Sequence, residues 1–204
     1  MATKQSSSDG KHTFASLLLV VVLFGSLAVL ALVPIDIFQA VRAREQLQIV
    51  NWLGQETDQW IMDKIFEVLT WMNTEAGQLM EASAASGVQK IDSWLVQRVY
   101  AATVWGHVIL YRLGMIFMWT AFALPCMFAA FVDGHYQRQI AKASFSSQSP
   151  LMHKYGMDLG KLVLAVLVAW VFVPMYVSTL IAPLAIVAFS IAWWLWVANL
   201  QKRL

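Results

Sequence analysis

The chain has 204 residues, of which 59% are hydrophobic and only 13% are charged. A soluble globular domain carries about 25% charged residues, so this composition and the mean hydropathy of +0.61 argue against a soluble protein. The formal net charge of +2 gives no general electrostatic case for nucleic acid, and we expect no direct nucleic-acid binding. The single cysteine, Cys126, cannot form an internal disulfide.

The N-terminal part predicts one membrane span. Residues 1–13 are polar and are expected to be a cytoplasmic tail, whereas residues 14–36 are expected to form transmembrane helix 1, closed by Pro34 and Asp36. A cleavable signal peptide is the alternative, because the chain begins with basic residues and has small residues around Ala40. The apolar core of a signal peptide is typically 7–15 residues, and this run is longer, so an uncleaved span is favoured.

Residues 37–112 contain no run that could span a membrane, but they have helical periodicity. Apolar residues recur every three or four positions from Ile49 to Leu79, and acidic and amide side chains fall mostly between them. A break at "ASAASG" ends in Gly87, and a second helical pattern then continues towards Tyr111. We therefore expect an extracytoplasmic segment of amphipathic helices.

The C-terminal half predicts three further spans. Residues 113–132 are expected to be transmembrane helix 2, 133–161 a polar cytoplasmic loop, 162–200 a transmembrane hairpin of helices 3 and 4, and 201–204 a cytoplasmic tail. The hairpin is expected because the uncharged stretch is too long for one helix and has Pro174 and Pro183 near its middle. Trp193, Trp194 and Trp196 are expected to anchor the last span at the interface. The predicted fold class is an all-α membrane protein with four transmembrane helices.

Orientation follows from the distribution of Lys and Arg. The segment 41–112 holds six basic and eight acidic residues, whereas the tails and the 133–161 loop are mainly basic. Because basic loops stay on the cytoplasmic side, both termini are expected in the cytoplasm and the 41–112 segment outside it.

Catalytic patterns are scarce, and we predict no enzyme, no cofactor and no metal site. The nearest phosphate-loop sequence is "GMDLGKL" from Gly156, which is one residue short and lacks the Ser or Thr that binds Mg²⁺. Gly156 and Gly160 could let a neighbouring helix approach closely, although ordinary loop glycines are favoured. Asp133, His135 and His153 are metal-binding residue types, but their spacing is not a specific signature.

Two polar residues precede the second span, and transport chemistry has few candidates. His107 and Arg112 lie near its outer end, where we expect them to reach the interface rather than to form a buried site. The centres of the spans carry hydroxyl and thiol groups but no carboxylate for a proton relay, so a transport function is disfavoured.

The extracytoplasmic helices carry more aromatic surface than a linker needs. A helical hairpin on the membrane accounts for it, and an exposed stripe that binds a partner or a second copy is the alternative. Membrane lipids are expected partners in either case. The candidate interaction stripe consists of Trp52, Trp60, Trp71 and Trp94.

The stretch "FVDGHYQRQIAKASFSSQSPLMHKYG" resembles a family of membrane proteins of integrating conjugative elements and conjugative plasmids. The matched features are a Val-Asp-Gly that leaves a span, a basic residue at Arg138 and a Ser-rich loop that leads to His153, followed by an apolar hairpin. The order of spans and helical segments is similar over most of the chain. A second basic residue comes only at Lys142, and Met152 stands where an aromatic residue is expected, so the match departs from the family pattern there.

The resemblance implies an accessory component of a conjugative type IV secretion system in the bacterial inner membrane. The implied partner is the coupling ATPase that delivers DNA, or another subunit of the secretion system. The candidate partner-docking loop consists of Asp133, Gly134, His135, Arg138, Lys142 and His153. Physically, Gly134 is expected to stop the helix, and Asp133 to pair with Arg138 or with a helix start. The alternative is a free-standing membrane protein, such as an exclusion or immunity factor or a small membrane enzyme.

Overall fold

A computed structural model describes residues 9–84, 89–144 and 149–200. These residues form six α-helices and no strand, which confirms the prediction of an all-helical chain. The helices are α1 (Asp9–Leu32), α2 (Ile35–Leu53), α3 (Gln55–Ala84), α4 (Gln89–Ala143), α5 (Pro150–Phe172) and α6 (Ile181–Ala198).

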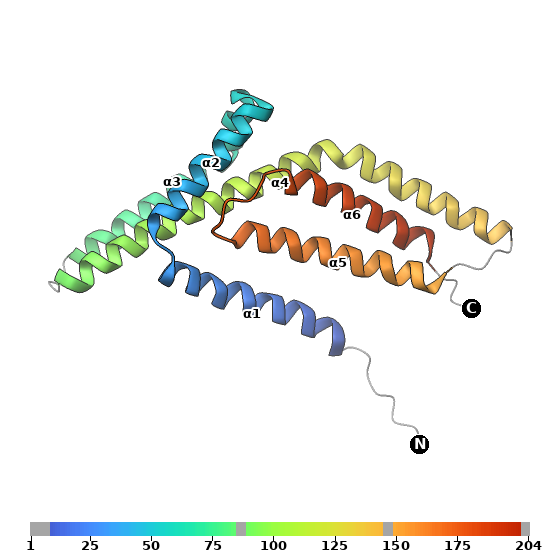
Figure 1. Cartoon of the computed structure of the whole chain (residues 1–204), viewed down its shortest axis with the longest axis horizontal. Coiled ribbons are helices and arrows are strands. Elements are labelled where there is room, and N and C mark those ends of the chain that lie inside the picture. Colours follow the sequence, from blue (N-terminus) through green and yellow to red (C-terminus); the bar gives the residue numbers. More distant parts are fainter. Residues whose placement is uncertain (1–8, 85–88, 145–148, 201–204) are drawn as a thin grey trace, which may run out of the picture.

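The helices are arranged around the long helix α4 (Figure 1). Its N-terminal part packs against α3, and α2 contacts both helices, while the antiparallel pair of α5 and α6 lies along its C-terminal part. Helix α1 is set apart and makes few contacts, which are with α4 and α5. The N-terminal end of α1, the C-terminal ends of α4 and α6 and the N-terminal end of α5 all lie at the same end of the molecule.

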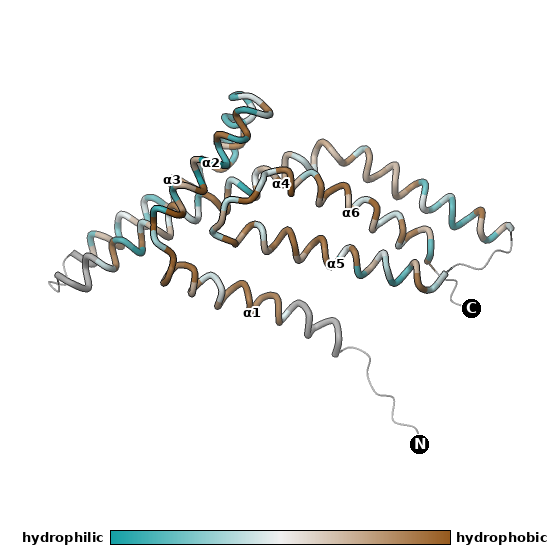
Figure 2. The backbone as a smooth tube through the Cα atoms, in the orientation of Figure 1, coloured by the Kyte–Doolittle hydropathy of each residue, from teal (hydrophilic) through white to brown (hydrophobic). Residues whose placement is uncertain are grey.

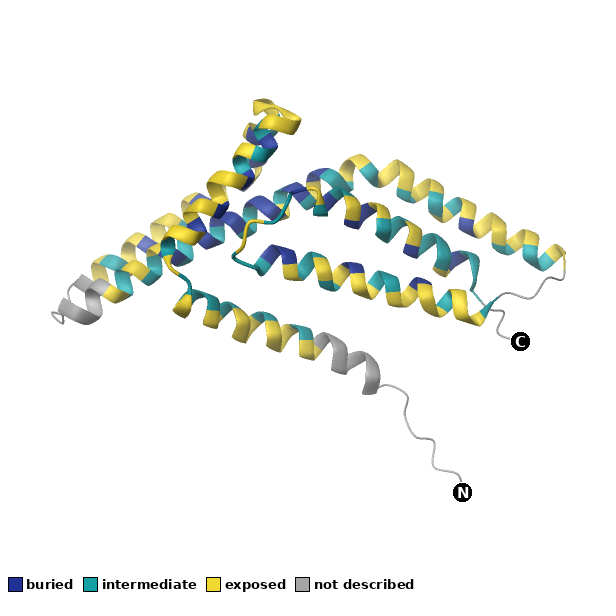
Figure 3. Ribbon diagram, in the orientation of Figure 1, coloured by how far each residue is buried: buried dark blue, intermediate teal, exposed yellow. Residues whose placement is uncertain are grey.

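Three helices are long and apolar enough to cross a membrane: Trp94–Ala143 within α4, Pro150–Phe172 and Ile181–Ala198. The number rises to four if Ser16–Leu32 and Ile35–Leu53 are counted as one span, although the two are bent by 110° at Pro34. Figure 2 shows apolar residues concentrated in α1, α5 and α6 and polar residues along α2 and α3. Figure 3 shows exposed residues along the outer faces of α1, α4 and α5, and many of these are large apolar side chains.

Helix α4 corrects the prediction of a loop at 133–161. It continues through Pro125 and Gly134 and ends only at Ala143, so its 55 residues extend over about 80 Å at 1.5 Å per residue. Helix α5 then begins at Pro150, with Ser149 accepting a hydrogen bond from the Met152 backbone N–H. Residues 145–148 lie outside the described parts of the chain. Most of the expected loop therefore belongs to the C-terminal end of α4 and the N-terminal end of α5.

Two glycines of the expected loop are sites of close helix packing. A Cβ atom on Gly156 would lie 2.7 Å from the backbone nitrogen of Trp196, and one on Gly134 would lie 3.1 Å from the carbonyl oxygen of Trp194. Gly134 thus lies at the crossing of α4 with α6, and the prediction that it stops the helix is wrong. The close approach considered for Gly156 is present, and the preference for ordinary loop glycines is wrong.

The largest core cluster lies where α2, α3, α4, α5 and α6 meet. It includes Ile49, Ile61, Tyr111, Met115 and Trp170, all at most 4% exposed. A second cluster, around Phe38 and Trp105, packs against the C-terminal end of α1. The two clusters meet at Ile109 and Phe172, so the apolar core is continuous along α4.

Candidate functional site

The most unusual feature of the core is a buried ion pair between Arg112 on α4 and Glu45 on α2. Both side chains are at most 1% exposed. The guanidinium Nε donates to both carboxylate oxygens, at 3.1 and 3.0 Å, and Nη2 donates to Oε1. Burial of a charge is costly unless it is paired and hydrogen-bonded. We expected Arg112 to reach the interface, and that prediction is wrong.

The same guanidinium binds the carbonyl groups where α5 ends. Nη1 donates to the carbonyl oxygens of Trp170, Val171 and Val173, and Nη2 donates to that of Met175 at 2.9 Å. The last carbonyls of a helix have no partner within it, and a cation near them is favourable because the helix dipole places negative charge there. Arg112 therefore closes the C-terminal end of α5.

These contacts matter because residues 173–180, between α5 and α6, are not helical. Backbone N–H and C=O groups that are buried outside a helix need hydrogen-bond partners from elsewhere in the protein. Arg112 supplies the partners for the first half of this segment. The break predicted around Pro174 and Pro183 is thus an ordered connection of residues 173–180 between α5 and α6. It is longer than the tight turn we expected.

Gln48 on α2 binds the second half of the 173–180 segment. Its side-chain N–H donates to Ser178 Oγ at 3.0 Å, and its Oε1 accepts from the Tyr176 hydroxyl and the Thr179 backbone N–H, both at 3.1 Å. Gln48 lies one turn after Glu45, on the same face of α2. One face of α2 therefore binds the segment at both ends, directly through Gln48 and through Arg112 by way of Glu45.

Asp58 on α3 completes this group of side chains. It is 7% exposed, and it accepts from Gln46 at 2.8 Å and from the Tyr111 hydroxyl at 2.7 Å. The Tyr111 ring stacks on His107, with 6.4 Å between ring centroids. We call Glu45, Gln46, Gln48, Asp58, Tyr111 and Arg112 the polar junction. It links α2, α3 and α4 to the segment between α5 and α6.

A second arginine of α4 plays a similar part at α1. Arg98 Nη1 donates to the carbonyl oxygens of Leu30 at 3.0 Å and Val33 at 3.1 Å, at the C-terminal end of α1. Its guanidinium also lies 5.9 Å from the Trp94 ring centroid. Arg98 thus holds the break at Pro34 against α4.

The structure distributes the six candidate docking residues over two helices. Asp133, Gly134, His135, Arg138 and Lys142 lie on α4, and His153 lies on α5. Asp133 accepts from the Trp194 indole N–H at 2.7 Å, and no ion pair joins it to Arg138. The partner of Asp133 is therefore Trp194, and neither expected alternative, Arg138 or a helix start, is observed.

Two of the docking residues carry a buried polar atom without a hydrogen-bond partner. These atoms are Nε of Arg138 and Nδ1 of His153. His135 is exposed, and its Nε2 lies 3.2 Å from the Gln139 side-chain nitrogen. Gly134 is buried against α6, so it cannot contact a partner without separating two helices.

The four tryptophans of the candidate stripe are exposed but lie on three helices. Trp52 lies on α2, Trp60 and Trp71 on α3 and Trp94 on α4, with exposures between 37% and 63%. Trp60 and Trp71 are three turns apart and share a face of α3. Trp60 stacks on Phe117 of α4, at 6.4 Å between centroids, so part of its surface is already covered.

The contacts of the polar junction fix helices relative to one another. In the described ranges, no group of three His, Cys, Asp or Glu side chains could hold a metal ion. In the polar junction Arg112 pairs with Glu45, and Asp58 accepts hydrogen bonds from Gln46 and Tyr111. The remaining donors of Arg112 bind backbone carbonyls of the chain itself. What the polar junction can do is fix the relative positions of α2, α4 and the α5–α6 pair.

Sequence reasoning missed most of the polar junction. It singled out Arg112 but did not name Glu45, Gln48 or Asp58. One signal was available: Glu45 continues the apolar stripe of α2 that Phe38, Val41 and Ile49 form, and all four residues are buried. A carboxylate on an apolar stripe needs a cation, and Arg112 provides it.

Comparison with known families now bears on this geometry. A family described as "IncC plasmid conjugative DNA transfer protein DtrJ-like" matches residues 30–201 of the chain. No curated protein and no solved structure gives a significant match. The matched range contains α2 to α6 and the whole polar junction, so the chain belongs to this family of conjugative DNA transfer proteins.

Proposed function

We propose that this conjugative DNA transfer protein is a non-enzymatic inner-membrane adaptor that binds the coupling ATPase of a type IV secretion system. The family description names DNA transfer and no reaction. Membrane association is supported by the helices that are long and apolar enough to cross a bilayer. The adaptor role and the partner are our inference.

The observation that carries the proposal is the character of the α4–α5 end, defined as residues 133–143 and 150–161. It holds Arg138, Lys142, Lys154 and Lys161 against two carboxylates, a net charge of +2. Protein interfaces are typically amphipathic, with apolar anchors and polar groups that find partners on binding. Large exposed apolar side chains accompany these charges: Tyr136, Ile140, Leu151, Met152 and Tyr155.

The unpartnered atoms of Arg138 and His153 favour docking over a solvated surface. Buried polar atoms are almost always hydrogen-bonded, and an exception calls for an explanation such as an absent partner. An acidic segment of the coupling ATPase would complement the net positive charge of this end. In our topology, this end faces the cytoplasm, where an ATPase must work.

The test measures the frequency of DNA transfer from donor cells. Their native element lacks the gene for this protein, and variants of the protein are supplied in trans. Arg138→Glu combined with Lys142→Glu should lower the transfer frequency at unchanged protein level, because it reverses the charge of the docking end. The matched control is Lys64→Glu, an exposed cation on α3. Full transfer by the double variant would contradict the proposal, and so would an equal loss with Lys64→Glu.

A free-standing role, such as exclusion, predicts a different result. Loss of the gene from the donor would leave transfer unchanged, and its expression in a recipient would reduce entry of the element. Both measurements use the same strains and separate the two functions.

A further inference from the structure

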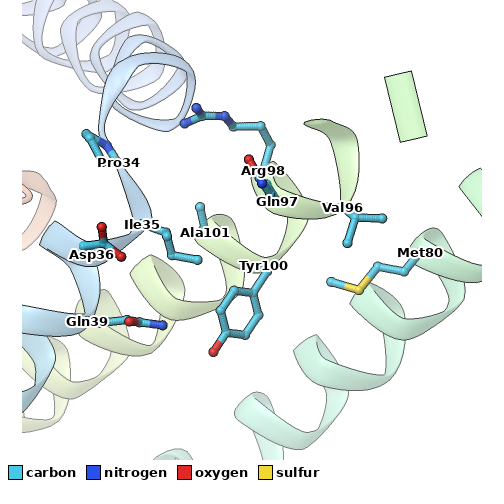
Figure 4. A pocket seen from close by; sticks show the side chains of 10 residues that line it. All are labelled: Pro34, Ile35, Asp36, Gln39, Met80, Val96, Gln97, Arg98, Tyr100 and Ala101. Atoms are coloured by element: carbon cyan, nitrogen blue, oxygen red, sulfur yellow. The ribbon is translucent and has the colours of Figure 1, made fainter. Parts of the chain in front are cut away.

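We propose that the cavity at the break between α1 and α2 binds the headgroup of a zwitterionic phospholipid such as phosphatidylethanolamine. The cavity has a volume of about 560 Å³ and is drawn in Figure 4. It lies between the first turn of α2, the end of α3 and the N-terminal part of α4. The residues that carry the argument are Asp36, Gln39, Met80, Val96, Arg98 and Tyr100.

Arg98 provides the phosphate contact. Its Nη1 is held by the Leu30 and Val33 carbonyls, so the guanidinium has a fixed position, and its Nε is buried without a partner. Figure 4 shows this side chain extending from α4 towards Pro34. A guanidinium matches the oxygens of a phosphate group in charge and geometry. Arg98 is one of the residues that line the cavity, so its guanidinium provides a cation there.

Asp36 selects the rest of the headgroup. Its carboxylate lines the same cavity from the first turn of α2, close to Pro34 and Gln39. A carboxylate that lines the same cavity as a guanidinium disfavours a purely anionic headgroup and favours one that also carries an ammonium group. Phosphoethanolamine has a phosphate and an ammonium two carbons apart, and each finds an opposite charge here.

The position of the cavity favours a lipid. The apolar run of α1 ends at Val33, immediately before Pro34, so the cavity lies where a span ends and headgroups are found. Its wall is mixed: Met80 and Val96 are apolar, whereas Gln39 and the exposed Tyr100 offer hydrogen-bonding groups. Its volume is in the range of small-ligand pockets.

The test uses the full chain, delipidated in a mild detergent, and follows the thermal unfolding midpoint by tryptophan fluorescence. Short-chain phosphatidylethanolamine should raise the midpoint at lower concentration than phosphatidylglycerol of the same chain length. Asp36→Asn should reduce this preference roughly three- to fivefold, as expected for one exposed charge pair. Val96→Phe should weaken both lipids by filling the cavity. The control is Asp63→Asn, an exposed carboxylate on α3 outside the cavity.

Arg98 variants are left out of the decisive set because this residue also holds the end of α1. Equal effects of the two lipids on the unaltered chain would overturn the proposal, as would an unchanged preference in Asp36→Asn. A full effect from glycerophosphoethanolamine, which has no acyl chains, would replace the lipid with a soluble phosphate ester. Inorganic phosphate is a further control. If it raises the unfolding midpoint as much as phosphatidylethanolamine does, the ammonium group has no part in binding and the proposal is wrong.

Discussion

Arg98 and Arg112 lie on one helix, α4, and each donates from Nη1 to the free carbonyls at the C-terminal end of a neighbouring helix. Arg98 caps the C-terminal end of α1, and Arg112 caps the C-terminal end of α5. Fourteen residues separate them, about 21 Å along the helix. Side chains of α4 therefore bind the C-terminal ends of two apolar helices, α1 and α5. Helix α4 then continues beyond Arg112 to the α4–α5 end.

The ion pair of Glu45 and Arg112 should dominate the stability of the fold. Arg112→Gln leaves the Glu45 carboxylate buried without a cation and removes donors from the α5 carbonyls, so we expect a loss of about 3–5 kcal/mol in the free energy of unfolding. Arg112→Lys should recover only part of it, because an ammonium cannot make the forked contacts. Unfolding in mixed detergent micelles measures both variants.

A double substitution separates the ion pair from its surroundings. Glu45→Gln combined with Arg112→Gln should be less destabilising than the sum of the single changes, because no lone charge remains. Strict additivity would show that the two residues act independently.

Gln48 should control the 173–180 segment without affecting the rest of the fold. Gln48→Ala removes one donor and one acceptor to that segment, so we expect a cost of about 1–3 kcal/mol. Hydrogen exchange should become faster at Thr179, whose N–H donates to Gln48. Gln59→Ala, on an exposed position of α3, is the control and should leave that exchange unchanged.

Gly156 should be intolerant of any side chain. Gly156→Ala places a Cβ atom 2.7 Å from the backbone of α6, so α5 and α6 must separate and the melting temperature should fall. The same change at another glycine, Gly77→Ala, should raise the melting temperature instead. Gly77 is helical with nothing within 4 Å of a Cβ, and alanine there should stabilise α3 by up to about 1 kcal/mol. Equal melting temperatures for the two variants would contradict the close packing.

Cysteine accessibility tests the orientation in the membrane. In a Cys126→Ala background, Asn73→Cys on α3 should react with an impermeant maleimide in intact spheroplasts. Gln137→Cys at the α4–α5 end should react only after permeabilisation. Both positions are exposed, so a difference reports the side of the membrane. The reverse labelling pattern would invert the topology and move the docking end out of the cytoplasm.

The sequence was sufficient for the local features of the fold. Periodicity predicted helices across 37–112, and the uncharged run from Leu162 to Leu200 predicted a break near Pro174, because these signals depend on near neighbours. Gly134 was misread because a glycine in a helix ends it in one context and admits a neighbouring helix in another. Which context applies depends on α6, some sixty residues later in the chain.

The polar junction required the tertiary structure. Glu45 and Arg112 are 67 residues apart, and nothing in their separate surroundings pairs them. A charge near the end of a span usually reaches the interface, and Arg112 departs from this because α2 crosses the bundle at its level. The available signal was Glu45, a carboxylate on the apolar face of α2. A charge on a buried face requires a counter-charge elsewhere in the fold.

The central claim is that the α4–α5 end contacts the coupling ATPase, and site-specific photo-crosslinking in cells that carry the native element tests it most directly. A photoreactive residue at Gln139, exposed on α4, should give an adduct that contains the ATPase. The same residue at Gln78, exposed on α3, should give none. An adduct from Gln78 alone, or no ATPase adduct from any exposed position of the α4–α5 end in variants that still support transfer, would contradict the adaptor role.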